Sequence, residues 1–199
     1  DVPKGLEYYH KALKIQEEII DKGGIALTLN NIGFIYINQD EIQKGLEYYK
    51  RALKLYTEIE DKSGIGFTLN NIGNGYKNLN KQDTALYYFN ESLKTCEEID
   101  YQEGIAACLN AIGTIYLKEN NYVKTLEYYQ KALGIFQNIN NSYGINNSLK
   151  DVGIVLLKLG KLNEALSYAN KSMMTSKEIG YPENIKNSAA LLKTIYQKQ

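Results

Sequence analysis

The stretch Leu29-Asn30-Asn31-Ile32-Gly33 returns forty residues later as Leu69-Asn70-Asn71-Ile72-Gly73. The same register gives Leu109-Asn110-Ala111-Ile112-Gly113 and Leu149-Lys150-Asp151-Val152-Gly153. A fixed period of this length is the sequence signature of a repeat architecture, in which each unit buries its apolar face against its neighbours. The chain is therefore predicted to be a solenoid.

The register defines four full repeats, over residues 24–63, 64–103, 104–143 and 144–183. Residues 1–23 match only the second half of a repeat, because Lys4–Tyr9 has the same sequence as Lys44–Tyr49. Residues 184–199 match only a first half. We therefore expect one solenoid over residues 1–199 that begins on an orphan second helix and ends on an orphan first helix, as a piece of a longer array would.

Each repeat divides into two helices by its apolar spacing. Positions i, i+3, i+4 and i+7 in the first half form one helical face, occupied by Leu29, Ile32, Gly33 and Tyr36. The second half, with Gly45, Tyr49 and Ala52, has a similar face. Asp40, Asn80, Asn120 and Gly160 lie between the halves and tolerate the left-handed backbone of a tight turn. The pattern predicts an all-α fold of about ten antiparallel helices, alternating between first (A) and second (B) helices.

The repeat resembles the tetratricopeptide repeat, whose signature is Trp-x2-Leu-Gly-x2-Tyr followed by Ala-x3-Phe and a proline. The second repeat matches at Leu69, Ile72, Gly73, Tyr76, Ala85 and Phe89. The signature tryptophan and proline are missing, and the period is longer than the common 34 residues. This variety resembles the arrays of bacterial sensor histidine kinases and cyclases, and of G-protein-signalling modulator adaptors. The resemblance implies a right-handed α-α superhelix that binds proteins or peptides, with A helices lining its concave groove.

Small residues are expected where the two helices of a repeat cross. Gly33 and its equivalents lie in mid-helix, where glycine costs about 1 kcal/mol relative to alanine. The facing position, Gly45 in the first repeat, is also small, which indicates a close crossing. One tyrosine recurs in each B helix, at positions 8, 48, 88, 128 and 168, and is expected to seal the seam between repeats with its hydroxyl in solvent.

The composition excludes several functions. Lys plus Arg and Asp plus Glu both number 23, so no net charge attracts nucleic acid or an anionic membrane, and no apolar run is long enough for direct membrane insertion. A single histidine and two distant cysteines predict no metal site, no cofactor and no enzyme. Cys96 and Cys108 are expected to be buried thiols without a disulfide, and the composition favours a cytoplasmic location, with a periplasmic sensor segment as the alternative.

The A-helix face that is left after packing against the B helix is the candidate peptide-binding groove. Its predicted residues are Asn30, Asn31, Phe34, Phe67, Asn70, Asn71, Asn74, Lys77, Asn110, Thr114, Lys118, Asn147 and Lys150, with Leu27, Ile37, Ala107, Asp151, Ile154 and Lys158 beside them. Asparagine is a poor helix former, so its recurrence at positions 30, 70 and 110 suggests amides that bond an extended peptide backbone. Duplication in an Asn-rich chain is the alternative explanation.

Two further interpretations follow from the same residues. Lys150 with Lys118 and Lys158 would hold an acidic side chain of a ligand, although a carboxylate clamp of several cations is not indicated. The chain is predicted to be the sensory or regulatory segment of a larger bacterial signalling protein. The alternative is a structural solenoid that self-associates head to tail, through Leu6, Tyr9 and Leu13 at one end and Leu192 and Tyr196 at the other.

Overall fold

The computed structural model describes residues 2–198, and the side chains of residues 4–198. All of its regular secondary structure in this range is α-helical, which confirms the predicted fold class. The ten helices are α1 (Val2–Glu18), α2 (Lys22–Asn38), α3 (Ile42–Glu58), α4 (Lys62–Asn78), α5 (Gln82–Glu98), α6 (Gln102–Lys118), α7 (Tyr122–Asn138), α8 (Ser142–Lys158), α9 (Leu162–Ile179) and α10 (Pro182–Tyr196). Even-numbered helices are A helices and odd-numbered helices are B helices.

The turns recur every twenty residues, at half the sequence period. The turn residues Ile20, Asp40, Glu60, Asn80, Asp100, Asn120, Asn140, Gly160 and Gly180 all have positive φ. After α2, the amide of Glu41 donates to the carbonyl of Tyr36 at 2.9 Å, the long bond of a Schellman motif. Asp21 begins α2 by accepting a hydrogen bond from the amide of Gly24 at 2.9 Å. The predicted left-handed turns at Asp40, Asn80, Asn120 and Gly160 are thus confirmed.

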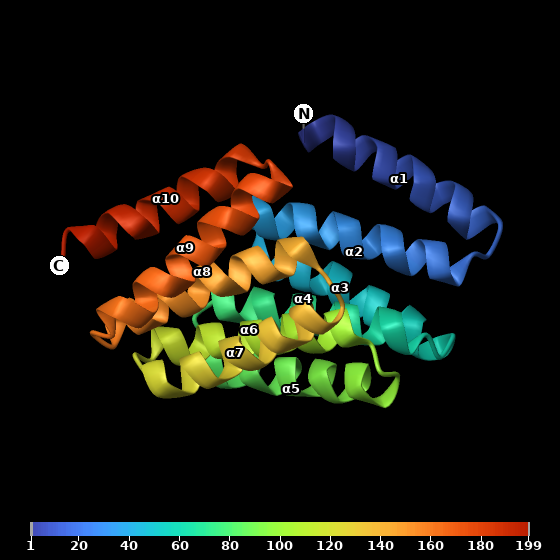
Figure 1. Ribbon diagram of the computed structural model, residues 1–199. Coiled ribbons are helices and arrows are strands. Elements are labelled where there is room, and N and C mark those ends of the chain that lie inside the picture. Colours follow the sequence, from blue (N-terminus) through green and yellow to red (C-terminus); the bar gives the residue numbers. More distant parts are fainter. Residues whose placement is uncertain (1, 199) are drawn as a thin grey trace. The chain divides into compact units, whose positions relative to one another are not determined.

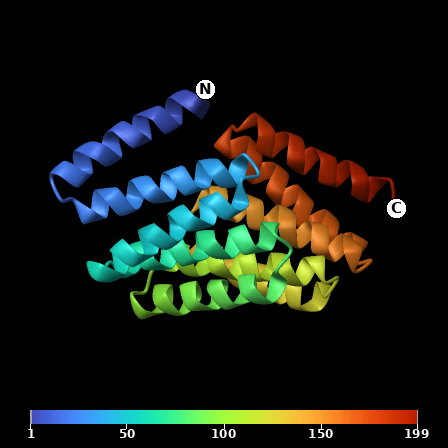
Figure 2. The same ribbon diagram turned by 180° about the vertical axis from the view of Figure 1, so that it is seen from behind.

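The chain divides into two compact units, Asp1–Gly104 and Ile105–Gln199. In the first unit α2 packs against α1 and α3, and α4 packs against α3 and α5 (Figures 1 and 2). In the second unit α8 packs against α7 and α9, and α10 packs on α9 and α8 (Figure 1). Each unit is therefore a stack of antiparallel helices in which sequence neighbours are spatial neighbours.

The crossing between α2 and α3 is as close as the small residues predict. A Cβ at Gly33 would lie 2.8 Å from the ring of Tyr49 and 3.0 Å from the carbonyl oxygen of Gly45. Conversely, a Cβ at Gly45 would lie 2.8 Å from the carbonyl oxygen of Gly33. Burial at this crossing raises the pKa of Tyr49 to about 12. The B-helix aromatic occupies the space that glycine leaves, and Gly73 with Phe89 repeats the arrangement.

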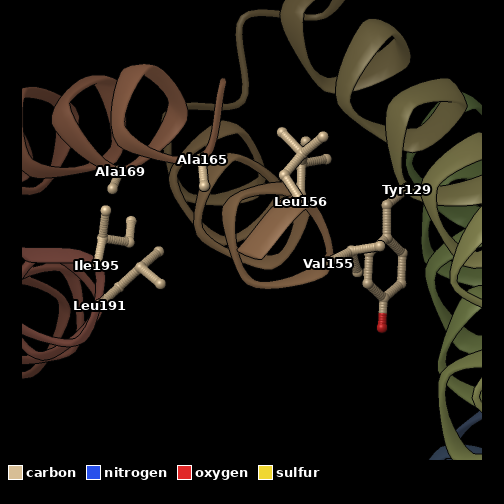
Figure 3. Packing of buried hydrophobic residues seen from close by; sticks show 8 residues of the cluster. Tyr129, Val155, Leu156, Ala165, Ala169, Leu191 and Ile195 are labelled. Carbon is tan, nitrogen blue, oxygen red and sulfur yellow. The ribbon is translucent and has the colours of Figure 1, made fainter. Parts of the chain in front are cut away.

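The fourth repeat fills the same space differently. Ala169 replaces the B-helix aromatic, and a Cβ at Gly153 would instead lie 3.1 Å from Cδ2 of Leu191, which α10 supplies. Leu191 and Ile195 are buried in one cluster with Ala165 and Ala169 (Figure 3). The final A helix therefore completes the core of the repeat before it.

Three of the five recurrent tyrosines, Tyr48, Tyr88 and Tyr128, stack on a tyrosine of their own repeat, whereas Tyr8 is exposed. Tyr48 lies 5.4 Å from Tyr36 between ring centroids, and Tyr88 lies 5.3 Å from Tyr76. Tyr88 also packs against a cluster that includes Leu46 of α3, so it contributes to the seam between repeats as well. The prediction of packing is confirmed for these residues, but the main ring contact is with the A helix of the same repeat.

Both cysteines, Cys96 and Cys108, are buried and neither forms a disulfide, as predicted. Between residues 2 and 198, no helix combines the length and the apolar character that crossing a bilayer requires.

Candidate functional site

The asparagine at position 30 does not face a groove, and the structure corrects that expectation. Its side chain is only 1% exposed. The Asn30 amide nitrogen donates to Oγ1 of Thr68 at 2.8 Å, so it joins α2 to the next A helix, α4. Thr68 in turn donates to the carbonyl of Gly64 at 2.7 Å. The poor helix former at position 30 is therefore explained by packing between A helices.

The asparagines further along α4 bond to one another. Asn74 donates from its amide nitrogen to Oδ1 and to the backbone carbonyl of Asn70, at 3.0 and 3.1 Å. The Lys77 ammonium donates to Oδ1 of Asn74 at 2.7 Å. Asn74 is thus largely satisfied within its own helix, and it presents few unused bonds to a ligand.

The neighbouring position, one residue later than Asn30 and Asn70, is partly exposed on both helices. Asn31 and Asn71 are both half-buried. Their side chains have no hydrogen-bond partner within the part of the chain that the structure describes. On the same two helices, Phe34 is 58% exposed and Phe67 is 53% exposed, and Leu27 is exposed too. Unit Asp1–Gly104 therefore presents exposed aromatic rings and unbonded amides on its A helices.

The second unit has a pocket of about 430 Å³ between α8 and α10. It is lined by Lys150, Ile154, Leu157, Lys158, Asn187, Ala190, Leu191 and Thr194. The structure thus brings together three residues that the sequence placed in the groove, Lys150, Ile154 and Lys158. The lining combines apolar side chains with the ammonium groups of Lys150 and Lys158.

Asp151 lies beside this pocket at the repeat position of Asn31 and Asn71. Lys150 Nζ is 3.4 Å from Oδ1 of Asp151, and both side chains are partly buried. Burial raises the pKa of Asp151 above its ordinary value, and the attraction of Lys150 opposes that rise. The pair places one positive and one negative charge at the edge of the pocket.

The remaining predicted residues, on α6 and α8, contribute unequally. Thr114 donates to the carbonyl of Asn110 at 2.9 Å and lies 3.2 Å from the hydroxyl of Tyr129, so it is a packing residue. Oδ1 of Asn110 is buried without a hydrogen-bond partner among residues 2–198. Lys118 is exposed, and Asn147 is half-buried.

The sequence analysis missed the residues that α10 adds to the pocket. Asn187, Ala190 and Thr194 occupy the repeat positions of Leu27, Asn30 and Phe34. Extending the 40-residue register into the orphan A helix would have found them. No group of three or more His, Cys, Asp or Glu side chains is placed to hold a metal ion within the described residues.

Comparison of the sequence with known protein families identifies the repeat. A family model described as Tetratricopeptide repeat matches residues 24–98 and 104–175. No curated protein sequence matches the chain.

Solved structures with the same fold have low sequence identity. BtubC from P. vanneervenii has a TM-score of 0.76 and 21% identity, covering 91% of this chain and 76% of its own. Aspartyl phosphate phosphatase F from Bacillus subtilis has a TM-score of 0.86 and 18% identity, covering 94% of this chain and 49% of its own. A Rap protein complexed with Competence and Sporulation Factor has a TM-score of 0.79 and 17% identity, covering 96% and 58%. The chain thus spans about half the length of the phosphatase.

Proposed function

We propose that this chain, which belongs to the tetratricopeptide repeat family, binds an extended peptide segment of another protein along its A helices. The observation that carries the proposal is the coincidence, on α2 and α4, of exposed Phe34 and Phe67 with the unbonded amides of Asn31 and Asn71. Tetratricopeptide repeats are generally non-catalytic interaction scaffolds, which agrees with this role.

The chemistry of the first unit suits a peptide backbone. Each asparagine amide both donates and accepts, so Asn31 and Asn71 match the N–H and C=O groups of an extended chain. Full burial of a phenylalanine side chain contributes about 1.5–3 kcal/mol of favourable free energy. Phe34 and Phe67 would therefore add to the binding free energy without requiring particular polar residues in the peptide.

The pocket between α8 and α10 suits one class of side chain. Ile154, Leu157 and Leu191 provide apolar contact, while Lys150 and Lys158 attract a carboxylate. A peptide residue that is apolar, next to an aspartate or glutamate, satisfies both features. We therefore propose that the second unit favours acidic segments with an apolar anchor.

The wider setting belongs to the same proposal. The Rap protein complexed with Competence and Sporulation Factor has this fold, and so does a signal transduction ATPase with a tetratricopeptide repeat sensor, each with a TM-score of 0.79. We infer a regulatory segment of a larger bacterial signalling protein, in a reducing cytoplasm where Cys96 and Cys108 stay as thiols.

The test is selection of binders from a random peptide library, followed by titration of the selected peptides. Asn71→Ala should weaken binding roughly 2- to 13-fold per lost hydrogen bond, because a hydrogen bond contributes about 0.5–1.5 kcal/mol. Phe67→Ala should weaken it further. The matched control is Asn90→Ala on the B helix α5, which is exposed and should bind as the unaltered chain does. Equal affinity in all three variants would refute the proposal.

A further inference from the structure

A pocket of about 350 Å³ lies between the B helices α1 and α3 of the first unit. The A helix α2 contacts both of them and lies between them (Figures 1 and 2). The volume is at the lower end of the range of about 300–1,000 Å³ that is typical of small-molecule sites. The pocket is lined by Glu17 of α1, by Ile25 and Leu29 of α2, and by Arg51, Lys54, Leu55 and Glu58 of α3. Its lining therefore combines aliphatic side chains with charges of both signs.

The aliphatic part of this lining is the edge of the hydrophobic core. Leu29 is buried in a cluster that α1, α2 and α3 share, and Ile25 and Leu55 pack against that cluster. Both of these flanking side chains are half-buried. An aliphatic group placed in the pocket would therefore extend the core and lose its contact with water, which favours binding.

Three charged groups of the pocket lack an ionic partner. The side chains of Glu17, Arg51 and Lys54 form no hydrogen bond or ion pair within the part of the chain that the structure describes. Glu58, by contrast, is already paired with Lys22 at 2.9 Å. An unpaired carboxylate from α1 and two unpaired cations from α3 thus line one pocket without bonding to each other.

This charge pattern is not a general property of the repeat. Where the positions equivalent to Glu17 and Arg51 lie together in one unit, they are Thr57 with Glu91, and Gln137 with Lys171. Neither pair combines a carboxylate with a cation. Arg51 is also the only arginine of the chain, and a guanidinium bonds a carboxylate through two parallel N–H groups, which lysine cannot do.

We propose that this pocket binds a small zwitterion with an aliphatic side chain, such as a free aliphatic amino acid. The carboxylate of the ligand is held by Arg51 and Lys54, and its ammonium group by Glu17. Its side chain lies on the aliphatic surface that Ile25 and Leu29 provide. Each part of the ligand thus meets a different helix, because the charges belong to α3 and α1 and the apolar surface belongs mainly to α2.

The site is separate from the proposed peptide-binding surface. Ile25 and Leu29 lie about 180° around α2 from Leu27 and Phe34, since successive residues differ by about 100°. Leu27 and Phe34 are more than half exposed, at 52% and 58%. An amino acid and a peptide could therefore occupy opposite sides of the same helix.

The test is titration of the chain with L-leucine and two truncated analogues. Isocaproate lacks the ammonium group of leucine, and isoamylamine lacks the carboxylate. Leucine should bind with a Kd on the order of 1 mM, as a ligand of this size does. Each analogue should bind about tenfold more weakly, because a charged hydrogen-bonding group is lost.

Two variants assign the charges of the ligand to residues of the pocket. Glu17→Gln should weaken binding of leucine and isoamylamine about tenfold and leave isocaproate unchanged. Arg51→Gln should weaken binding of leucine and isocaproate and leave isoamylamine unchanged. Both side chains are exposed, so neither variant should alter the melting temperature.

Lys171→Gln is the matched control. Lys171 has the repeat position of Arg51, and its ammonium group lies 5.6 Å from the centroid of the Tyr168 ring, as the Arg51 guanidinium lies 5.5 Å from that of Tyr48. The position equivalent to Glu17 is Gln137 in that repeat, so no carboxylate is available there. The control should bind leucine as the unaltered chain does.

NMR shifts of the Ile25 and Leu55 methyl groups locate the ligand. Shifts at Leu27 instead would place leucine on the peptide-binding surface and overturn the proposal. Equal affinities for the three compounds would overturn it too, as would the absence of leucine binding or an equal loss in Lys171→Gln and Arg51→Gln. Peptides selected on the A-helix surface should bind Arg51→Gln normally, so the two proposals fail separately.

Discussion

Asn30 and Thr68 join two consecutive A helices through a buried hydrogen bond of 2.8 Å. The bond runs between side chains 38 residues apart, and the close approach of Gly75 to Ile37 has the same offset. Both contacts show that α2 and α4 lie side by side in one register. The two adjacent asparagines of α2 therefore differ, because Asn30 joins two A helices and Asn31 makes no side-chain hydrogen bond within the described chain.

Asn30→Ala should lower the free energy of unfolding by about 1 kcal/mol, because a buried hydrogen bond is lost and Thr68 loses a donor. Asn71→Ala removes no hydrogen bond within the described chain and improves helix propensity, so it should be neutral or slightly stabilising. Urea denaturation of both variants measures the difference. Equal loss of stability would mean that position 71 is also a packing position.

Ile20→Asn should stabilise the chain by about 0.5–1 kcal/mol, since isoleucine is β-branched and disfavours the left-handed backbone that it adopts at φ 58°. Asparagine tolerates this region and occupies the equivalent turns at positions 80, 120 and 140. The control is Ile19→Asn, which removes a side chain of similar exposure, 67% against 76%, from a residue outside the left-handed region. Only Ile20→Asn should raise the melting temperature.

Ala169→Phe restores the aromatic of the repeat pattern, yet it should destabilise the chain by about 1–3 kcal/mol. The space beside Gly153 is already occupied by Leu191 from α10, so the ring would overpack the cluster (Figure 3). The double variant Ala169→Phe with Leu191→Ala should recover part of the loss. Thermal unfolding of the three proteins tests the coupling, and additive losses would disprove it.

Asp151→Asn should raise stability near neutral pH, because burial of the carboxylate raises the Asp151 pKa. The folded chain then binds the proton more tightly than the unfolded chain, whose carboxyl has a pKa near 3.8. The ionised group destabilises the folded state at pH 7, and that cost disappears as the pH falls through the folded pKa. Melting curves at about pH 7 and about pH 3 should show a stabilising effect of the substitution only at the higher pH.

The sequence by itself determined the repeat, its helix pairs and its turns. A 40-residue period with glycine at each crossing leaves few alternatives, because each such glycine costs stability in an isolated helix and is compensated only by close packing. The same register identified Lys150, Ile154 and Lys158, which line one pocket. It also identified the buried positions Leu29, Ile32 and Tyr36.

Only the tertiary structure decided which asparagine faces a neighbouring helix. Adjacent residues differ by about 100° around a helix. Inside the stack, α4 contacts its own B helix α5, the preceding B helix α3 and the A helix α2. The apolar spacing along one helix indicates its contact with its own B helix but not its contacts with other helices. The spacing therefore did not distinguish Asn30 from Asn31. In the fourth repeat Ala169 stands in place of the B-helix aromatic, and Leu191 fills the space. The sequence spacing could not predict this compensation, because the two residues belong to different repeats.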